Sequence, residues 1–134
     1  MSKASDDEQV QRAVEQRMRE LEELYGRVPL VPQVLSERPD IFLPYTTLAD
    51  AAMQRTKHLD RRTAELAAIA AGSALASAHC LNVHIDAAFR EGAKHDEVLE
   101  AMQIGAFMAM TRSESVALRA LQEAEGRAAN NGKS

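Results

Sequence analysis

Apolar residues recur every three or four positions along much of this chain, and that spacing restricts it to helices. Between Asp6 and Tyr25 they form one stripe among charged residues: Val10, Val14, Met18, Leu21 and Leu24. This pattern predicts an amphipathic helix with one solvated face, ended by Gly26. No segment alternates like a strand between turn signals, so the sequence predicts an all-α fold of about six to seven helices.

Proline, capping residues and glycine mark the middle helices. The three prolines between positions 27 and 40 predict a connector with at most a short helix, followed by a helix over roughly Asp40 to Arg55. Asp60 is a typical N-cap for a helix that runs to about Ala76. Ser77 is a second N-cap, and it opens a helix from about residue 78 to 91 that Gly92 closes.

The last third of the chain predicts two more helices. The first, from about Asp96 to Met110, contains MQIGAFMAM and is apolar on every side, which indicates burial in the core or against another subunit. Ser113 is expected to cap a final helix that ends near Gly126. The predicted organisation is an N-terminal helix over 1–25, one domain over 26–126 and a flexible tail over 127–134.

Charge and composition exclude several classes of partner. The 134 residues carry 20 acidic and 16 basic side chains and a net charge of −4, which offers no basic surface for nucleic acid. No window reaches the ~18 to 20 apolar residues of a membrane span, and the polar start lacks a secretory signal, so we expect a cytoplasmic protein. The single cysteine forms no internal disulfide and is either buried filler or chemistry.

The stretch SAHCLNVH holds that cysteine between two histidines. Cys80 and His84 are four residues apart on one predicted helix, so their side chains share a face. Cys80 falls in the first turn, where the helix dipole and a nearby imidazole both favour the nucleophilic thiolate. Glu65 lies on the preceding helix, and a tight reversal near Ser77 brings its carboxylate within reach of a histidine, which it can orient as a base.

These residues resemble the family of carboxymuconolactone decarboxylases and alkylhydroperoxidase D proteins. The redox branch of that family carries a Glu, a Cys twelve residues later, a His before a second Cys three further on, and a His four after that. The matching positions here are Glu65, Ser77, His79, Cys80 and His84. The likeness continues through LDRRTAEL before the motif and IDAAFREGAKHDEVLEAM after it, and more weakly from Tyr25 to the last helix.

The resemblance implies a homo-oligomer, commonly a trimer or hexamer, without a cofactor. It also implies that Cys80 attacks a hydroperoxide while Glu65, His79 and His84 relay protons, as in a peroxiredoxin-like antioxidant protein. Ser77 departs from the pattern because a hydroxyl cannot resolve a sulfenic acid or form a disulfide. An oxidised Cys80 would therefore need an external reductant, either a small thiol or Cys80 of another subunit, and Ser77 would support the thiolate by a hydrogen bond.

Other interpretations remain open. The decarboxylase branch of the family lacks the cysteine pair and acts on a lactone acid, so His84 would transfer the proton and a cation would hold the substrate carboxylates. The available cations are Arg61, Arg62, Arg90 and Arg112. A non-catalytic family member, with Cys80 as packing, is a third interpretation. Adjacent residues on a helix diverge by about 100°, so His79 and Cys80 are poorly placed to share a metal ion, and no metal is expected.

Overall fold

The computed structural model describes residues 3–132, and every regular element in that range is helical. The helices are α1 (Lys3–Tyr25), α2 (Leu30–Leu35), α3 (Pro39–Ala49), α4 (Arg61–Ala74), α5 (Ala78–Arg90) and α6 (His95–Asn131), with a π-helical turn η1 (Asp50–Gln54) after α3. The predicted all-α fold is confirmed for this part of the chain.

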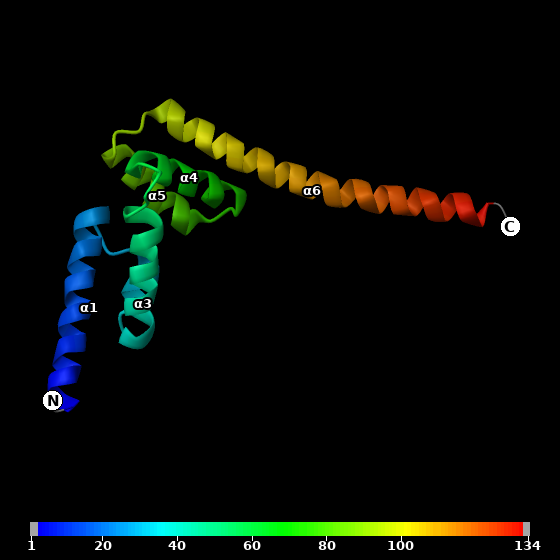
Figure 1. Cartoon of the computed structure of the whole chain (residues 1–134). Coiled ribbons are helices and arrows are strands. Elements are labelled where there is room, and N and C mark those ends of the chain that lie inside the picture. Colours follow the sequence, from blue (N-terminus) through cyan, green and yellow to red (C-terminus); the bar gives the residue numbers. More distant parts are fainter. Residues whose placement is uncertain (1–2, 133–134) are drawn as a thin grey trace.

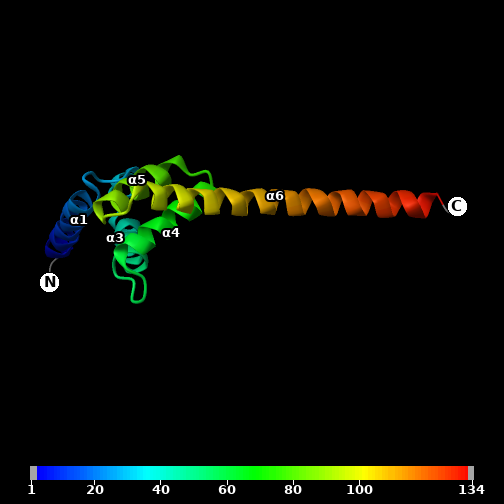
Figure 2. The same ribbon diagram turned by 90° about the horizontal axis from the view of Figure 1, so that it is seen from above.

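The helices form two groups that lie against each other near one end of the molecule (Figure 1). Helices α1 and α3 lie side by side, while α4, α5 and the first part of α6 pack together next to them (Figure 1). Seen from above, α6 continues far beyond this cluster as one rod (Figure 2). The principal core joins α4, α5 and α6 and is built from small and aliphatic side chains: Ile69, Ala88, Ala93, Val98 and Ala101.

Local capping fixes the two helices that carry the motif. The Asp60 carboxylate accepts a hydrogen bond of 2.7 Å from the backbone N–H of Thr63, which lowers the pKa of Asp60. The Ser77 hydroxyl oxygen accepts one of 3.3 Å from the backbone N–H of Cys80, and Gly92 follows α5 with a φ of 82°. Both N-caps and the closing glycine lie where the sequence predicts them.

Helix α6 corrects the prediction of two separate C-terminal helices. It runs unbroken from His95 to Asn131, so Ser113 caps nothing and Gly126 does not end the helix. The hydroxyls of Thr111 and Ser115 each donate to a carbonyl three residues earlier, at 3.0 and 3.1 Å, and are thereby satisfied within the helix. Residues 127–131 of the expected tail are helical, while 133–134 lie outside the described residues.

The helix predicted over 40–55 is also divided. Its α-helical part ends at Ala49, and the following turn to Gln54 is π-helical, with the Arg55 N–H donating to the Asp50 carbonyl at 3.0 Å. The guanidinium of Arg61 donates to the Met53 carbonyl at 2.6 Å. This bond ties the irregular turn to the beginning of α4, beside the motif.

The contact between α4 and α6 is unusually close at Gly105. A Cβ atom at Gly105 would overlap the backbone carbonyl of Ala70 and lie 3.0 Å from Cβ of Ser73. One turn away, the Ser73 hydroxyl donates to the Met102 carbonyl at 2.9 Å. The absence of a side chain at Gly105 therefore allows the two backbones to approach.

Candidate active site

A cavity of about 290 Å³ opens where α1, the α2–α3 region and α5 meet. Its polar lining consists of Tyr25, Tyr45, Thr46, His79, Cys80 and His84. The remaining lining residues, among them Leu21, Pro32 and Val83, are apolar. The structure thus brings the three reactive side chains of the SAHCLNVH motif, His79, Cys80 and His84, to the wall of one cavity.

Cys80 is partly buried in the first turn of α5, as the sequence predicts. Within the described residues its sulfur makes no hydrogen bond, so neither His79 nor His84 is bonded to the thiol in this state. The Ser77 hydroxyl bonds the Cys80 backbone N–H and not the sulfur. The thiol therefore lines the cavity without a hydrogen-bonding partner.

Glu65 and His84 form a close polar contact between α4 and α5. Oε2 of Glu65 lies 2.7 Å from Nδ1 of His84, and the glutamate side chain is completely buried. A carboxylate in this position accepts the Nδ1 proton, which leaves Nε2 as the basic nitrogen of the imidazole. The contact expected between α4 and α5 is present, and it orients His84 toward acid–base chemistry.

Arg61 completes the environment of Glu65. Its guanidinium lies 3.0 Å from Oε1 of Glu65 and 3.6 Å from a carboxylate oxygen of Glu91. Both oxygens of the buried carboxylate therefore have partners, which offsets the cost of burying its charge. Arg61 and His84 thus share the same carboxylate.

Tyr25 is a site residue that the motif does not reveal. It lines the cavity from the end of α1, and its hydroxyl oxygen accepts a hydrogen bond of 3.0 Å from the side-chain amide of Gln54. Burial raises the pKa of Tyr25, and the negative charge of Glu65 raises it further. The phenol stays protonated, and because Gln54 occupies a lone pair, its O–H remains available as a donor.

The arginines considered for binding a carboxylate substrate lie away from this cavity. Arg61 pairs with Glu65, Arg62 lies 3.0 Å from Glu97, and Arg90 donates to the Leu24 carbonyl at 3.2 Å. Arg112 lines a different cavity on α6. None of the four is among the residues that line the cavity of Cys80.

Sequence comparison assigns the chain to a family. The profile of the carboxymuconolactone decarboxylase family matches residues 39–123, more than half of the chain. The chain belongs to this family. Comparison with curated proteins and with solved structures finds no significant match. The region matched to the carboxymuconolactone decarboxylase family contains Glu65, Cys80 and His84 but not Tyr25 on α1.

The described residues show neither a membrane-spanning helix nor a metal-binding cluster. In residues 3–132, no helix is long and apolar enough to cross a membrane. The same residues contain no group of three or more histidine, cysteine, aspartate or glutamate side chains arranged to hold a metal ion.

Proposed function

We propose that this protein reduces hydroperoxides through Cys80, as a single-cysteine, peroxiredoxin-like antioxidant enzyme of the carboxymuconolactone decarboxylase family. One observation carries the proposal. Cys80 lines the same cavity as His84, whose Nδ1 is held 2.7 Å from the buried Glu65. A nucleophile beside a base that a third group orients is the arrangement that covalent catalysis requires.

The proposed reaction begins with transfer of the thiol proton from Cys80 to Nε2 of His84. The thiolate attacks the terminal oxygen of the hydroperoxide, so that an S–O bond forms and the O–O bond breaks. Cys80 is oxidised to the sulfenic acid, and the departing alkoxide takes the proton from His84 to leave as an alcohol. Glu65 keeps its charge and stabilises the imidazolium, while His79, which also lines the cavity, assists the proton transfer.

The cycle closes with an external thiol. Ser77 occupies the position from which a second cysteine would attack the sulfenic acid, and its hydroxyl caps α5 instead. Two molecules of a small thiol, or one dithiol, would reduce the sulfenic acid to Cys80 thiol and water and would themselves become a disulfide. The proposal therefore requires a reductant that enters the cavity.

The lining of the cavity supports a hydroperoxide over a lactone acid as the substrate. It is apolar apart from two tyrosines, a threonine, two histidines and the thiol. A lactone acid carries carboxylates that a guanidinium would hold well, but Arg61, Arg62 and Arg90 are engaged elsewhere. Tyr25 offers a neutral donor that suits an uncharged peroxide oxygen.

The deciding experiment exposes the reduced protein to equimolar alkyl hydroperoxide with a sulfenic-acid trap and follows intact mass over a pH series. We expect rapid addition of one trap molecule that is absent in Cys80→Ala and strongly slowed in His84→Ala. Lack of trapping in the wild type would exclude the peroxidase function. Turnover of 4-carboxymuconolactone that survives Cys80→Ala would instead establish the decarboxylase, and absence of both activities would indicate a non-catalytic member.

A further inference from the structure

Tyr25 forms part of the wall between two cavities. It lines the cavity of about 290 Å³ that holds Cys80, and it also lines a smaller cavity of about 70 Å³ between α1, α3 and η1. Gln54, the last residue of η1, lines the smaller cavity only. Gln54 therefore reaches the phenol from outside the space in which Cys80 lies.

The hydrogen bond between these two side chains leaves the phenol proton free. Nε2 of Gln54 donates to the Tyr25 hydroxyl oxygen at 3.0 Å. Because the amide nitrogen carries only donors, the phenol accepts in this bond and keeps its own O–H for another partner. Within residues 3–132 that O–H donates to no group. Burial raises the pKa of Tyr25, so the phenol stays protonated at neutral pH.

The position of Gln54 depends on the same guanidinium that pairs with Glu65. Arg61 donates at 2.6 Å to the carbonyl of Met53, the residue before Gln54. It also lies 3.0 Å from Oε1 of Glu65, whose other oxygen contacts His84. One side chain thus fixes both the π-helical turn that carries Gln54 and the carboxylate that orients the base.

We propose, as an inference that rests on the peroxidase function above, that Tyr25 donates a hydrogen bond to the leaving oxygen of the hydroperoxide and that Gln54 positions it. When the Cys80 thiolate attacks the terminal oxygen, the S–O bond forms, the O–O bond breaks and negative charge develops on the oxygen that stays with the alkyl group. The phenol stabilises this charge and keeps its own proton, since the proton that completes the alcohol comes from His84. In a cavity with a largely apolar lining, such a donor lowers the barrier to O–O cleavage.

The test compares two oxidants that differ in their leaving group. An alkyl hydroperoxide such as tert-butyl hydroperoxide releases a basic alkoxide, whereas peracetic acid releases acetate, which needs little stabilisation. The rate of thiol loss at Cys80 is measured for each oxidant. We expect Tyr25→Phe to slow the reaction with tert-butyl hydroperoxide by about ten-fold or more and the reaction with peracetic acid by less than about three-fold.

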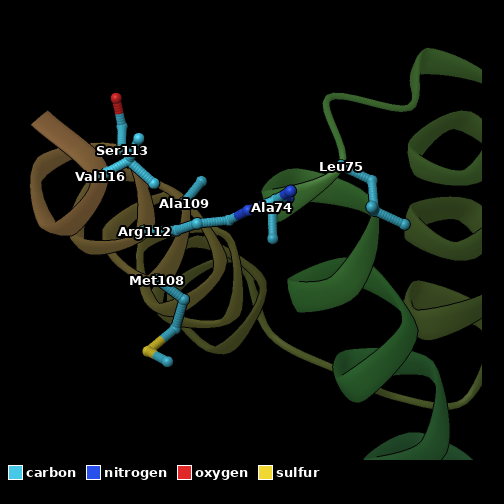
Figure 3. Close-up of a pocket in the computed structure, with 7 residues that line it drawn as sticks. All are labelled: Ala74, Leu75, Met108, Ala109, Arg112, Ser113 and Val116. Atoms are coloured by element: carbon cyan, nitrogen blue, oxygen red, sulfur yellow. The ribbon is translucent and has the colours of Figure 1, made fainter. Parts of the chain in front are cut away.

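Ser113→Ala is the matched control for Tyr25→Phe, because it also removes one hydroxyl from the wall of a cavity. Ser113 lines a separate cavity between the end of α4 and the middle of α6 (Figure 3). Cys80 is not part of that cavity, so both rates should stay at the wild-type level.

Gln54→Glu examines the hydrogen bond without removing Tyr25. A carboxylate can only accept, so it would take the phenol proton that Gln54 leaves free. The reaction with tert-butyl hydroperoxide should therefore be slowed about as much as in Tyr25→Phe, while the reaction with peracetic acid is again affected little. Gln9→Glu is the control, since it adds the same charge at an exposed position of α1 and should keep both wild-type rates.

Equal slowing with both oxidants in Tyr25→Phe would indicate a structural role and would overturn the proposal, as would unchanged rates. Gln54→Glu with the wild-type ratio of the two rates would also overturn it. Failure of the peroxidase function itself gives a different result, because wild-type Cys80 would then react with tert-butyl hydroperoxide no faster than a free small thiol does.

Discussion

Oε2 of Glu65, which is fully buried in α4, lies 2.7 Å from Nδ1 of His84 in α5. Because Arg61 occupies the other carboxylate oxygen, the glutamate is held from both sides and cannot rotate away from the imidazole. The tautomer of His84 is thereby set, with its second nitrogen free to act as a base. The direct way to examine this pair is to remove the charge of Glu65 and keep its shape.

Glu65→Gln should slow hydroperoxide-dependent oxidation of Cys80 by roughly a hundred-fold, because an amide neither fixes the basic tautomer nor stabilises the imidazolium. The rate is measured as loss of free thiol after mixing with hydroperoxide. Glu97→Gln is the control, since Glu97 pairs with Arg62 at the surface and should keep the wild-type rate. An unchanged rate in Glu65→Gln would mean that the pair is structural.

Tyr25→Phe should change how stability depends on alkaline pH. The folded-state pKa of Tyr25 is raised above its usual value of 10.0, chiefly by burial. The neutral phenol is thus favoured in the folded protein, and its contribution is present below pH 10.0 and is lost as pH rises through the folded-state pKa. Urea titrations at increasing pH measure this loss. Between pH 10.0 and the folded-state pKa of Tyr25, the free energy of unfolding should fall faster with pH in the wild type than in Tyr25→Phe. Parallel curves throughout would contradict the raised pKa.

Ser77→Cys should restore a dithiol one helical turn from Cys80. Residue 77 sits immediately before α5, where its side chain already contacts the Cys80 backbone at 3.3 Å. After one oxidation by hydroperoxide, intact mass should show the loss of two hydrogens instead of a trapped sulfenic acid. Ser73→Cys is the comparison variant, because Ser73 bonds to α6 and should leave the sulfenic acid trappable. Persistence of the trapped adduct in Ser77→Cys would show that this geometry does not support a disulfide.

Gly105→Ala should destabilise the fold although alanine favours helices. The added methyl would overlap the Ala70 carbonyl, and overpacking of about 1–3 kcal/mol exceeds a gain in helix propensity of about 1 kcal/mol. Gly126→Ala lies on the same helix with no atom within 4 Å of the added methyl, so it should gain up to about 1 kcal/mol. Chemical denaturation measures both, and equal effects would mean that α4 and α6 yield at this contact.

The features that could be predicted from the sequence are those decided by neighbouring residues. Asp60 and Ser77 are identified as N-caps because each side chain acts within three residues of its own position. The pairing of Glu65 with His84 follows from two consecutive helices joined by a short reversal. Local patterns of this kind also place Cys80 in the first turn of α5.

Other features depend on contacts between distant segments and leave no local signal. Tyr25 and Gln54 are 29 positions apart, and only the folded chain joins their side chains beside the cavity. Ser113 has the composition of a cap, but nothing in its neighbourhood reveals that α6 continues through it. The π-helical turn likewise depends on Arg61, which supplies a partner for the Met53 carbonyl.

The wall of the cavity formed by Leu21, Tyr25 and Pro32 lies before residue 39, where the match to the family begins. Other lining residues, which include Cys80 and His84, lie within the matched region. Exchanging the first 38 residues for those of a relative would change this wall while leaving Glu65, Cys80 and His84 in place. Under the proposed function, such chimeras should differ in which hydroperoxides they accept and should keep the same reactive thiol.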